Sequence, residues 1–300
     1  MMDLEKTKTS LAGAGAGLAA AVVTCPLDLV KTRIQNQSRP VQGVHYYRGT
    51  FASLMSIFKE GGVRGLYRGL GPTILGYLPT WAIYFSVYDR AKDRIPYLID
   101  KSPNNPVCHM LSAMTAGCMS TMFTNPLWVI KTRIMTQSPH SAYQYRNTFH
   151  ALQSVYFSEG IRGFYKGLLT SLFGVTHVIV QFPLYEYLKS SLHAAEDGQV
   201  KVKNVLLASC ISKMTASACT YPHEVIRTRL QNQIHKPYKY KGVFHAIKLI
   251  AKEEGYSAFY SGFRTNLIRT VPASAITIMT YELLINKLNY IIPNQPKLMT

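Results

Sequence analysis

Three copies of one nine-residue motif recur along the chain, and this repetition limits the folds that it can adopt. The copies are CPLDLVKTR at Cys25 to Arg33, NPLWVIKTR at Asn125 to Arg133, and YPHEVIRTR at Tyr221 to Arg229. Their prolines stand 100 and 96 residues apart. Repetition at a nearly fixed spacing predicts a structure built from three similar units.

Two further landmarks follow each motif in the same order. The first is a tyrosine that lies two residues before a glycine, at Tyr67, Tyr165 and Tyr260. The second is a tyrosine followed by an acid, at Tyr88, Tyr185 and Tyr281. The three predicted repeats cover residues 1–100, 101–197 and 198–300.

Long uncharged segments predict a membrane protein. Charge-free runs cover residues 11–27, 69–88, 102–130 and 167–185, and a helix needs about 20 such residues to cross a bilayer. The third repeat is interrupted by Lys213 and Arg269. We expect six spans, two in each repeat. A soluble helical solenoid is the alternative, but its helices would each carry a charged face, which these segments lack.

The charge balance indicates anionic partners. Thirty-three basic residues against 15 acidic ones give a net charge of +18, which suits nucleic acid, acidic lipid or an anionic solute. Nucleic acid is disfavoured because the bases recur beside the spans and do not form one face. Motifs typical of enzymes are missing, and the five cysteines form no CxxC pair. We therefore expect no enzyme activity, no cofactor and no metal site.

In the first and third motifs an acid stands two residues after the proline and a base stands five after it. The pairs are Asp28 with Lys31 and Glu224 with Arg227. Positions three apart lie on neighbouring faces of a helix. If three such helices surround an axis, the acid of one faces the base of the next, and the prolines bend the helices together. The pattern predicts a ring of ion pairs that closes one end of a barrel.

The repeated PxDxxK-type motif, the EG and aromatic-glycine landmarks and the six spans resemble the mitochondrial carrier family, from about Leu11 to Leu288. The resemblance implies an all-α membrane protein, with six transmembrane helices in a threefold pseudo-symmetric barrel. Three short matrix-side helices would lie at Thr50 to Lys59, Thr148 to Ser158 and Val243 to Glu253. It also implies a multi-pass carrier of the mitochondrial inner membrane that works by alternating access.

The resemblance assigns the motif residues to a matrix gate. It pairs Asp28 with Lys131 and Glu224 with Lys31, and it sets Arg227 against Trp128, where the other repeats have an acid. We expect the guanidinium to stack on the indole, although Trp128 could also fill space or face lipid. The matrix gate further includes Gln35 and Gln231, which match the family's glutamine braces, whereas Met135 cannot act as a brace.

A second ring is implied at the cytoplasmic side, where Tyr-acid-x-x-Lys sequences occur in the first two repeats. The candidate ion pairs are Asp89 with Lys189 and Glu282 with Lys92, which leaves Glu186 without a motif partner. Each pair could instead be a structural contact that never opens. Two rings at opposite ends favour a transporter with two gates.

Residues midway along the spans are the candidates for solute binding, because the family's substrate contacts lie on the even-numbered helices. His177 could alternatively be a neutral core histidine, and Lys213 could extend to the membrane surface. The candidates are Gly76, Thr80, Trp81, Tyr84, Phe173, Gly174, His177, Gln181, Lys213, Arg269, Thr270 and Ser274.

Aromatic and cationic groups in this set suit a planar anion that stacks and binds through phosphate or carboxylate. The sequences PLWVIKTR, LPTWAIYFSVY and NLIRTVPASAIT resemble the family members that carry NAD, folate or FAD, and pyrimidine nucleotides. We expect NAD import in exchange for a nucleotide, with folate or FAD and pyrimidine nucleotides as alternatives. A non-transporting receptor is a remote alternative. The expected partners are the nucleotide-like solute and membrane lipid in the form of cardiolipin, and we expect a monomer.

Overall fold

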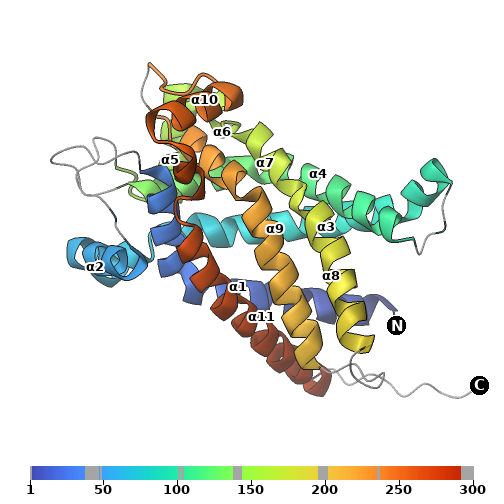
Figure 1. The fold of residues 1–300 in the computed structure, drawn as a ribbon. Coiled ribbons are helices and arrows are strands. Elements are labelled where there is room, and N and C mark those ends of the chain that lie inside the picture. Colours follow the sequence, from blue (N-terminus) through green and yellow to red (C-terminus); the bar gives the residue numbers. More distant parts are fainter. Residues whose placement is uncertain are drawn as a thin grey trace, which may run out of the picture.

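The computed structural model describes residues 2–37, 47, 49–100, 102, 105–137, 144–194, 202–234 and 237–291, and all regular elements in these ranges are helices. Figure 1 labels them along the chain. The described helices up to residue 164 are α1 (Met2–Asn36), α2 (Thr50–Leu66), α3 (Leu70–Ile99), α4 (Pro106–Thr136), α5 (Thr148–Glu159) and α6 (Ile161–Phe164). The others are α7 (Leu168–Val175), α8 (His177–Ala194), α9 (Val202–Gln231), α10 (Val243–Glu253), the 3₁₀ helix η1 (Tyr256–Tyr260) and α11 (Phe263–Ile291).

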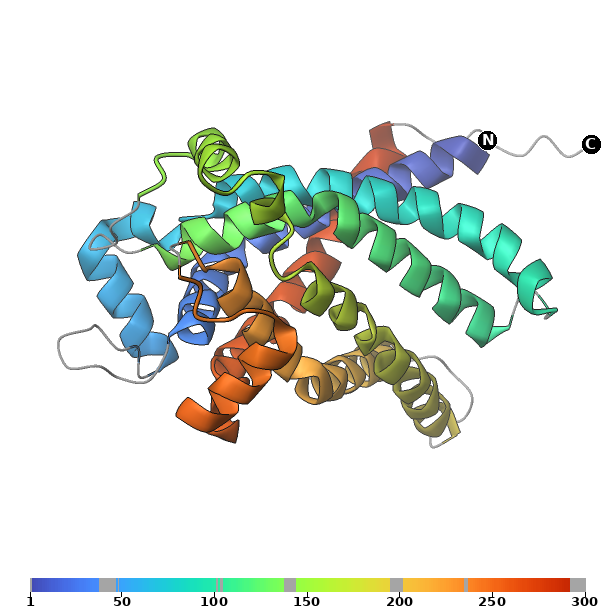
Figure 2. The ribbon, with the colours of Figure 1, turned by 90° about the horizontal axis from the view of Figure 1, so that it is seen from above.

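Long helices of neighbouring repeats pack in pairs. Helix α3 runs along α4, α1 runs along α11, and α7 with α8 runs along α9. Figure 2 shows that the three pairs come together at one end and spread apart toward the other. The short helices α2, α5 and α10 surround the end where the pairs meet.

The end where the pairs meet is built from the three motifs, and we call it the motif end and the opposite end the far end. Pro26, Pro126 and Pro222 lie inside α1, α4 and α9. The apolar residues that follow each proline are buried, such as Val30 and Ile130 at 0% exposure. They form three core clusters, each of which joins a long helix to the short helix of the same repeat. Burial of this apolar surface stabilises each repeat, and it also links neighbouring repeats, because Met135 of the second repeat belongs to the cluster of the first.

The short helices begin at the residues that the sequence predicts. Helix α5 begins at Thr148 and α10 at Val243, while α2 begins at Thr50 and continues to Leu66 across a kink at Gly62. Gly62 has φ 59°, a backbone conformation that favours glycine. The predicted repeat junction between residues 197 and 198 lies outside the described residues, and so does Lys101 at the start of the second repeat.

Among the described helices, two segments are long and apolar enough to cross a membrane by length and composition alone. They are Ala12–Asn36 and Ile161–Ser191. The other predicted spans do not meet this measure. Helices α9 and α11 show the physical reason, because they carry Lys213, Glu224 and Arg269 within their length, and such groups lower the mean hydropathy of a span even when they face a cavity.

Candidate functional site

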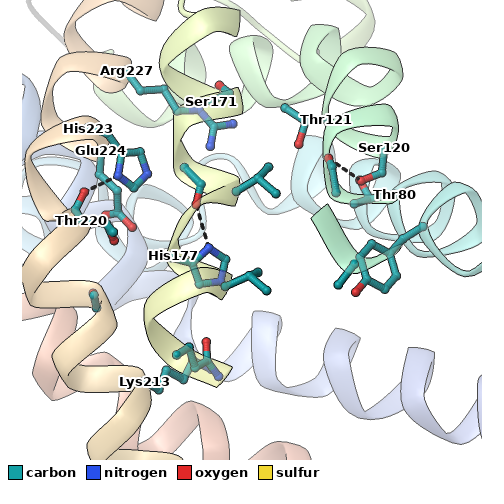
Figure 3. A pocket seen from close by; sticks show the side chains of 18 of the residues that line it. Thr80, Ser120, Thr121, Ser171, His177, Lys213, Thr220, His223, Glu224 and Arg227 are labelled. Atoms are coloured by element: carbon teal, nitrogen blue, oxygen red, sulfur yellow. Dashed lines mark hydrogen bonds between the residues drawn. The ribbon is translucent and has the colours of Figure 1, made fainter. Parts of the chain in front are cut away.

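A cavity of about 580 Å³ lies between α3, α4, α7, α8, α9 and α11. Its size is typical of a small-molecule site. Figure 3 shows side chains from several of these helices directed toward the same space. Its wall combines aromatic rings with hydroxyl, amide, imidazole and cationic groups. Such a wall can bind the apolar and the anionic parts of one ligand.

Nine of the twelve predicted binding residues line this cavity. The exceptions are Gly76, Phe173 and Ser274. Gly76 packs against the indole of Trp128, where an added Cβ would lie 3.7 Å from the ring, and the Phe173 side chain is 51% exposed. The cavity-lining residues of the predicted set are Thr80, Trp81, Tyr84, Gly174, His177, Gln181, Lys213, Arg269 and Thr270.

The sequence analysis missed polar residues of α4 and α9 that line the same cavity. Thr121 and Ser217 both stand five residues before a motif proline, and this shared register was the signal that could have identified them. His223 directly follows Pro222 and also lines the cavity. Helices α4 and α9 therefore contribute more to the cavity than Lys213, the one residue of these two helices in the predicted set.

Both predicted ion pairs at the motif end are present. Lys131 Nζ lies 2.7 Å from Asp28 Oδ2, and Lys31 Nζ lies 2.6 Å from Glu224 Oε2. Gln35 donates from Nε2 to Glu224 Oε2 at 3.1 Å, which is the contact that the predicted brace requires. These contacts join α1 to α4 and α9, and they close the floor of the cavity.

The predicted stacking of Arg227 on Trp128 is wrong for this structure. The cation over the indole is Lys131, with Nζ 5.1 Å from the ring centroid. The indole N–H donates to Thr124 Oγ1 at 3.1 Å, and Tyr77 approaches the ring edge-on at a centroid distance of 6.1 Å. Lys131 can reach the ring because it lies three residues further along the same helix, on the next turn.

Arg227 and Gln231 lack the contacts that a third ion pair would supply. Arg227 lines the cavity and has no ion pair or hydrogen bond with any described residue. Gln231 accepts a hydrogen bond from Thr132 at 2.8 Å, but its Nε2 is buried and has no partner. The brace of the third repeat therefore has no carboxylate to bind. At the corresponding position of the second repeat, the Met135 sulfur accepts a weak contact from Thr32 at 3.7 Å.

Arg269, predicted only as a binding residue, reaches both the cavity and the motif-end ion pairs. Its Nε lies 3.6 Å from Asp28 Oδ1. The same Nε is buried and has no hydrogen-bond partner among the described residues. This long contact leaves Arg269 able to accept an anion from the cavity side.

The predicted ion pairs at the far end are not formed in this structure. Asp89, Lys92, Glu186 and Glu282 are exposed, and Lys189 lies near the Tyr185 ring, with Nζ 5.8 Å from its centroid. None of these groups forms an ion pair within the part of the chain that the structure describes. The cause is the spreading of the helix pairs at that end (Figure 2), so the cavity is closed at the motif end and open at the far end.

A third set of ion pairs was missed and holds the short helices in place. Arg133 binds Glu159 through two hydrogen bonds of 2.6 and 2.9 Å, and Arg229 binds Glu254 in the same way. Burial raises the pKa of Glu159, but hydrogen bonds from Arg133 and Lys166 outweigh it and hold that pKa below its usual range. The signal was the last residue of each motif, an arginine in all three copies.

Comparisons with known proteins agree with this architecture. The sequence pattern of the family described as "Mitochondrial carrier protein" matches three times, at residues 3–97, 102–196 and 198–291. The "Mitochondrial nicotinamide adenine dinucleotide transporter 1" of Saccharomyces cerevisiae is 43% identical over 94% of this chain and 78% of its own length. The "Nicotinamide adenine dinucleotide transporter 1, chloroplastic" of Arabidopsis thaliana is 45% identical, over 91% of this chain and 89% of its own length. The "Solute carrier family 25 member 36-A" of Danio rerio is 37% identical over 93% of this chain and 96% of its own length.

Proposed function

Because this chain belongs to the mitochondrial carrier family, a family of solute transporters and not of enzymes, we propose that its substrate is NAD, imported in exchange for a nucleotide. The observation that carries the proposal is a cationic and aromatic cavity that is closed at the motif end and open at the far end. Two relatives named as NAD transporters match more than nine-tenths of this chain, which supports this choice among anionic solutes.

The architecture that we propose is a barrel of six transmembrane helices, formed by α1, α3, α4, α7 with α8, α9 and α11. The motif-end ion pairs act as one gate, and the far-end charges form the other when the first opens. Alternating access requires that the two rings are never closed or open together. The open far end and the closed motif end describe one of the two states.

The cavity chemistry suits a dinucleotide. Lys213, Arg227 and Arg269 line it, and phosphate oxygens accept strong hydrogen bonds from such groups. Trp81 of α3 also lines the cavity, is 42% exposed, and stacks on Phe85 at a centroid distance of 5.5 Å. A nicotinamide or adenine ring can stack on an aromatic side chain of this kind.

The location that we propose is the mitochondrial inner membrane. One similar relative is named as chloroplastic and another as mitochondrial, so the family membership alone leaves the organelle open.

We further propose a monomer that contacts cardiolipin, with repeats at residues 1–100, 101–197 and 198–300. Folate or FAD and pyrimidine nucleotides are the alternative substrates.

Transport by the purified protein in liposomes tests the proposal. Vesicles loaded with AMP are mixed with labelled NAD, FAD, folate, or pyrimidine and purine nucleotides in turn. We expect NAD to enter fastest, and entry to depend on the internal nucleotide. Faster entry of FAD, folate or a pyrimidine nucleotide would replace NAD as the substrate, and no entry of any of them would favour a non-transporting receptor. Vesicles without protein serve as the control.

A further inference from the structure

Arg227 is the base of the third motif, and it differs from the equivalent bases of the other two. Lys31 and Lys131 each lie within 2.7 Å of a carboxylate oxygen. The threefold repetition would place an acid at residue 128 opposite Arg227, but Trp128 occupies this position. A cation without a carboxylate partner inside a span is costly. Arg227 therefore needs an anion that the motifs do not provide.

The neighbours of Arg227 form no ion pair or hydrogen bond with its guanidinium in the described part of the chain. Glu224, one turn away on α9, is bound by Lys31 and by Gln35. The Nε2 of Gln231, one turn further along, is buried and unpartnered, so the place of the missing carboxylate has not been taken by another acceptor. Within the described residues, Arg227 forms no ion pair, hydrogen bond or contact with an aromatic ring.

Arg227 faces the cavity. Figure 3 shows its guanidinium directed into the space beside Ser171, with Lys213 on the opposite side of His177. Arg269 lines the same cavity. Glu224 is the carboxylate among the lining residues, and Lys31 neutralises it at 2.6 Å. The cavity therefore holds an excess of positive charge. Part of this charge belongs to Arg227, which the sequence analysis assigned to the matrix gate.

We propose that Arg227 is a substrate ligand that binds a phosphate group of the transported nucleotide, and that Trp128 keeps it available by denying it a gate partner. This inference rests on the proposed function. The planar guanidinium can donate two parallel hydrogen bonds to one phosphate. The substrate anion then supplies the charge that the motif lacks, and α9 contributes to binding as well as to the gate.

Binding to the purified protein tests this role, with adenosine, AMP and NAD as probes that carry no, one and two phosphates. Arg227→Gln should weaken NAD binding by roughly 10-fold to 100-fold, the range expected for hydrogen bonds to a charged group. Adenosine binding should not change. The NAD affinity of Arg227→Lys should lie between that of the wild type and that of Arg227→Gln. Arg162→Gln is the control, because Arg162 is an exposed arginine of α6 that does not line the cavity.

A second pair of variants leaves Arg227 in place. Trp128→Asp should draw the guanidinium into an ion pair and weaken NAD binding, whereas the uncharged Trp128→Asn should do so much less. These variants decide the matter if Arg227→Gln does not fold. Equal NAD affinity in the wild type, Arg227→Gln and Trp128→Asp would overturn the inference while the proposed function stands. A wild type that binds no phosphate-bearing probe would instead overturn the proposed function, and this inference with it.

Discussion

Glu224→Gln should weaken the motif-end gate while keeping the shape of the side chain. The carboxylate of Glu224 accepts from Lys31 Nζ at 2.6 Å and from Gln35 Nε2 at 3.1 Å. Glutamine can still accept one hydrogen bond, but it cannot balance the charge of Lys31. The variant therefore leaves Lys31 without its ion pair in the closed state. The open state is not affected, because this pair is broken there in the parent protein as well.

The magnitude follows from the burial of the two partners. Removing one partner of a fully buried ion pair costs about 3–5 kcal/mol, whereas exposed pairs contribute about 0–1 kcal/mol. The side chain of Lys31 is 10% exposed and that of Glu224 is 30% exposed. We therefore expect the closed state to lose about 2 kcal/mol, between these limits. This loss changes the ratio of the two states by about 30-fold.

The distance between the far ends of α3 and α8 reports the ratio of the two states, closed or open at the motif end. Spin labels at Tyr97→Cys and Tyr187→Cys suit this measurement, because both tyrosines are well exposed, at 88% and 68%. The native cysteines are first replaced, since they are free thiols. The spread far ends predict a long distance in the parent protein. Glu224→Gln should increase the share of a shorter distance, as the far end closes when the motif end opens.

Glu253→Gln is a matched control. Glu253 pairs with Lys239 at 2.7 Å, a similar length, but both side chains are 44% exposed. Its removal should leave the distance distribution unchanged, because this pair lies away from the gate. Our reasoning would be refuted if Glu224→Gln also left the distribution unchanged, or if both variants shifted it equally.

Three further predictions concern the cavity and the short helices. Arg269→Ala should abolish uptake of the anion and, because Arg269 also contacts Asp28 at 3.6 Å, should slightly weaken the closed motif end; uptake at the wild-type rate would remove Arg269 from the site. Trp81→Ala should weaken nucleotide binding by roughly 1–3 kcal/mol if a base stacks on the indole, and unchanged affinity in a binding titration would return Trp81 to a packing role. Arg133→Met should destabilise the fold by about 3–5 kcal/mol, because it leaves the carboxylate of Glu159 buried without its main partner; thermal unfolding measures this. The depressed pKa of Glu159 means that its contribution is present above the usual carboxyl range and is lost as the pH falls through the folded-state value, so an unchanged unfolding temperature at low pH would contradict this assignment.

The repeated motif determined much of the architecture before any coordinates. Three prolines, each followed by a base at the same offset, predict three equivalent helices, and both ion pairs of Asp28 and Glu224 are found where the family resemblance places them. The starts of the short helices at Thr148 and Val243 were predicted as well. The motif and its spacing repeat along the chain and can be read from it, whereas the particular pairings and the short helices were implied by the family resemblance.

Contacts between helices were decided by the tertiary structure. The sequence alone could not show whether Lys131 or Arg227 lies over Trp128, because the answer depends on the distance between α4 and α9 and not on spacing within a helix. The same holds for Arg269, whose contact with Asp28 spans 241 residues of sequence. Long side chains can reach several partners, and only helix packing selects among them.

The far end shows a different limit. The motif predicts that Asp89 and Lys189 pair in a second gate, yet they form no ion pair here because the helix pairs spread at that end. A sequence encodes the side chains that can pair in each state of a protein that changes shape. Which pairs are formed depends on the state that the packing adopts, and in the proposed alternating-access cycle the two ends would not be closed together.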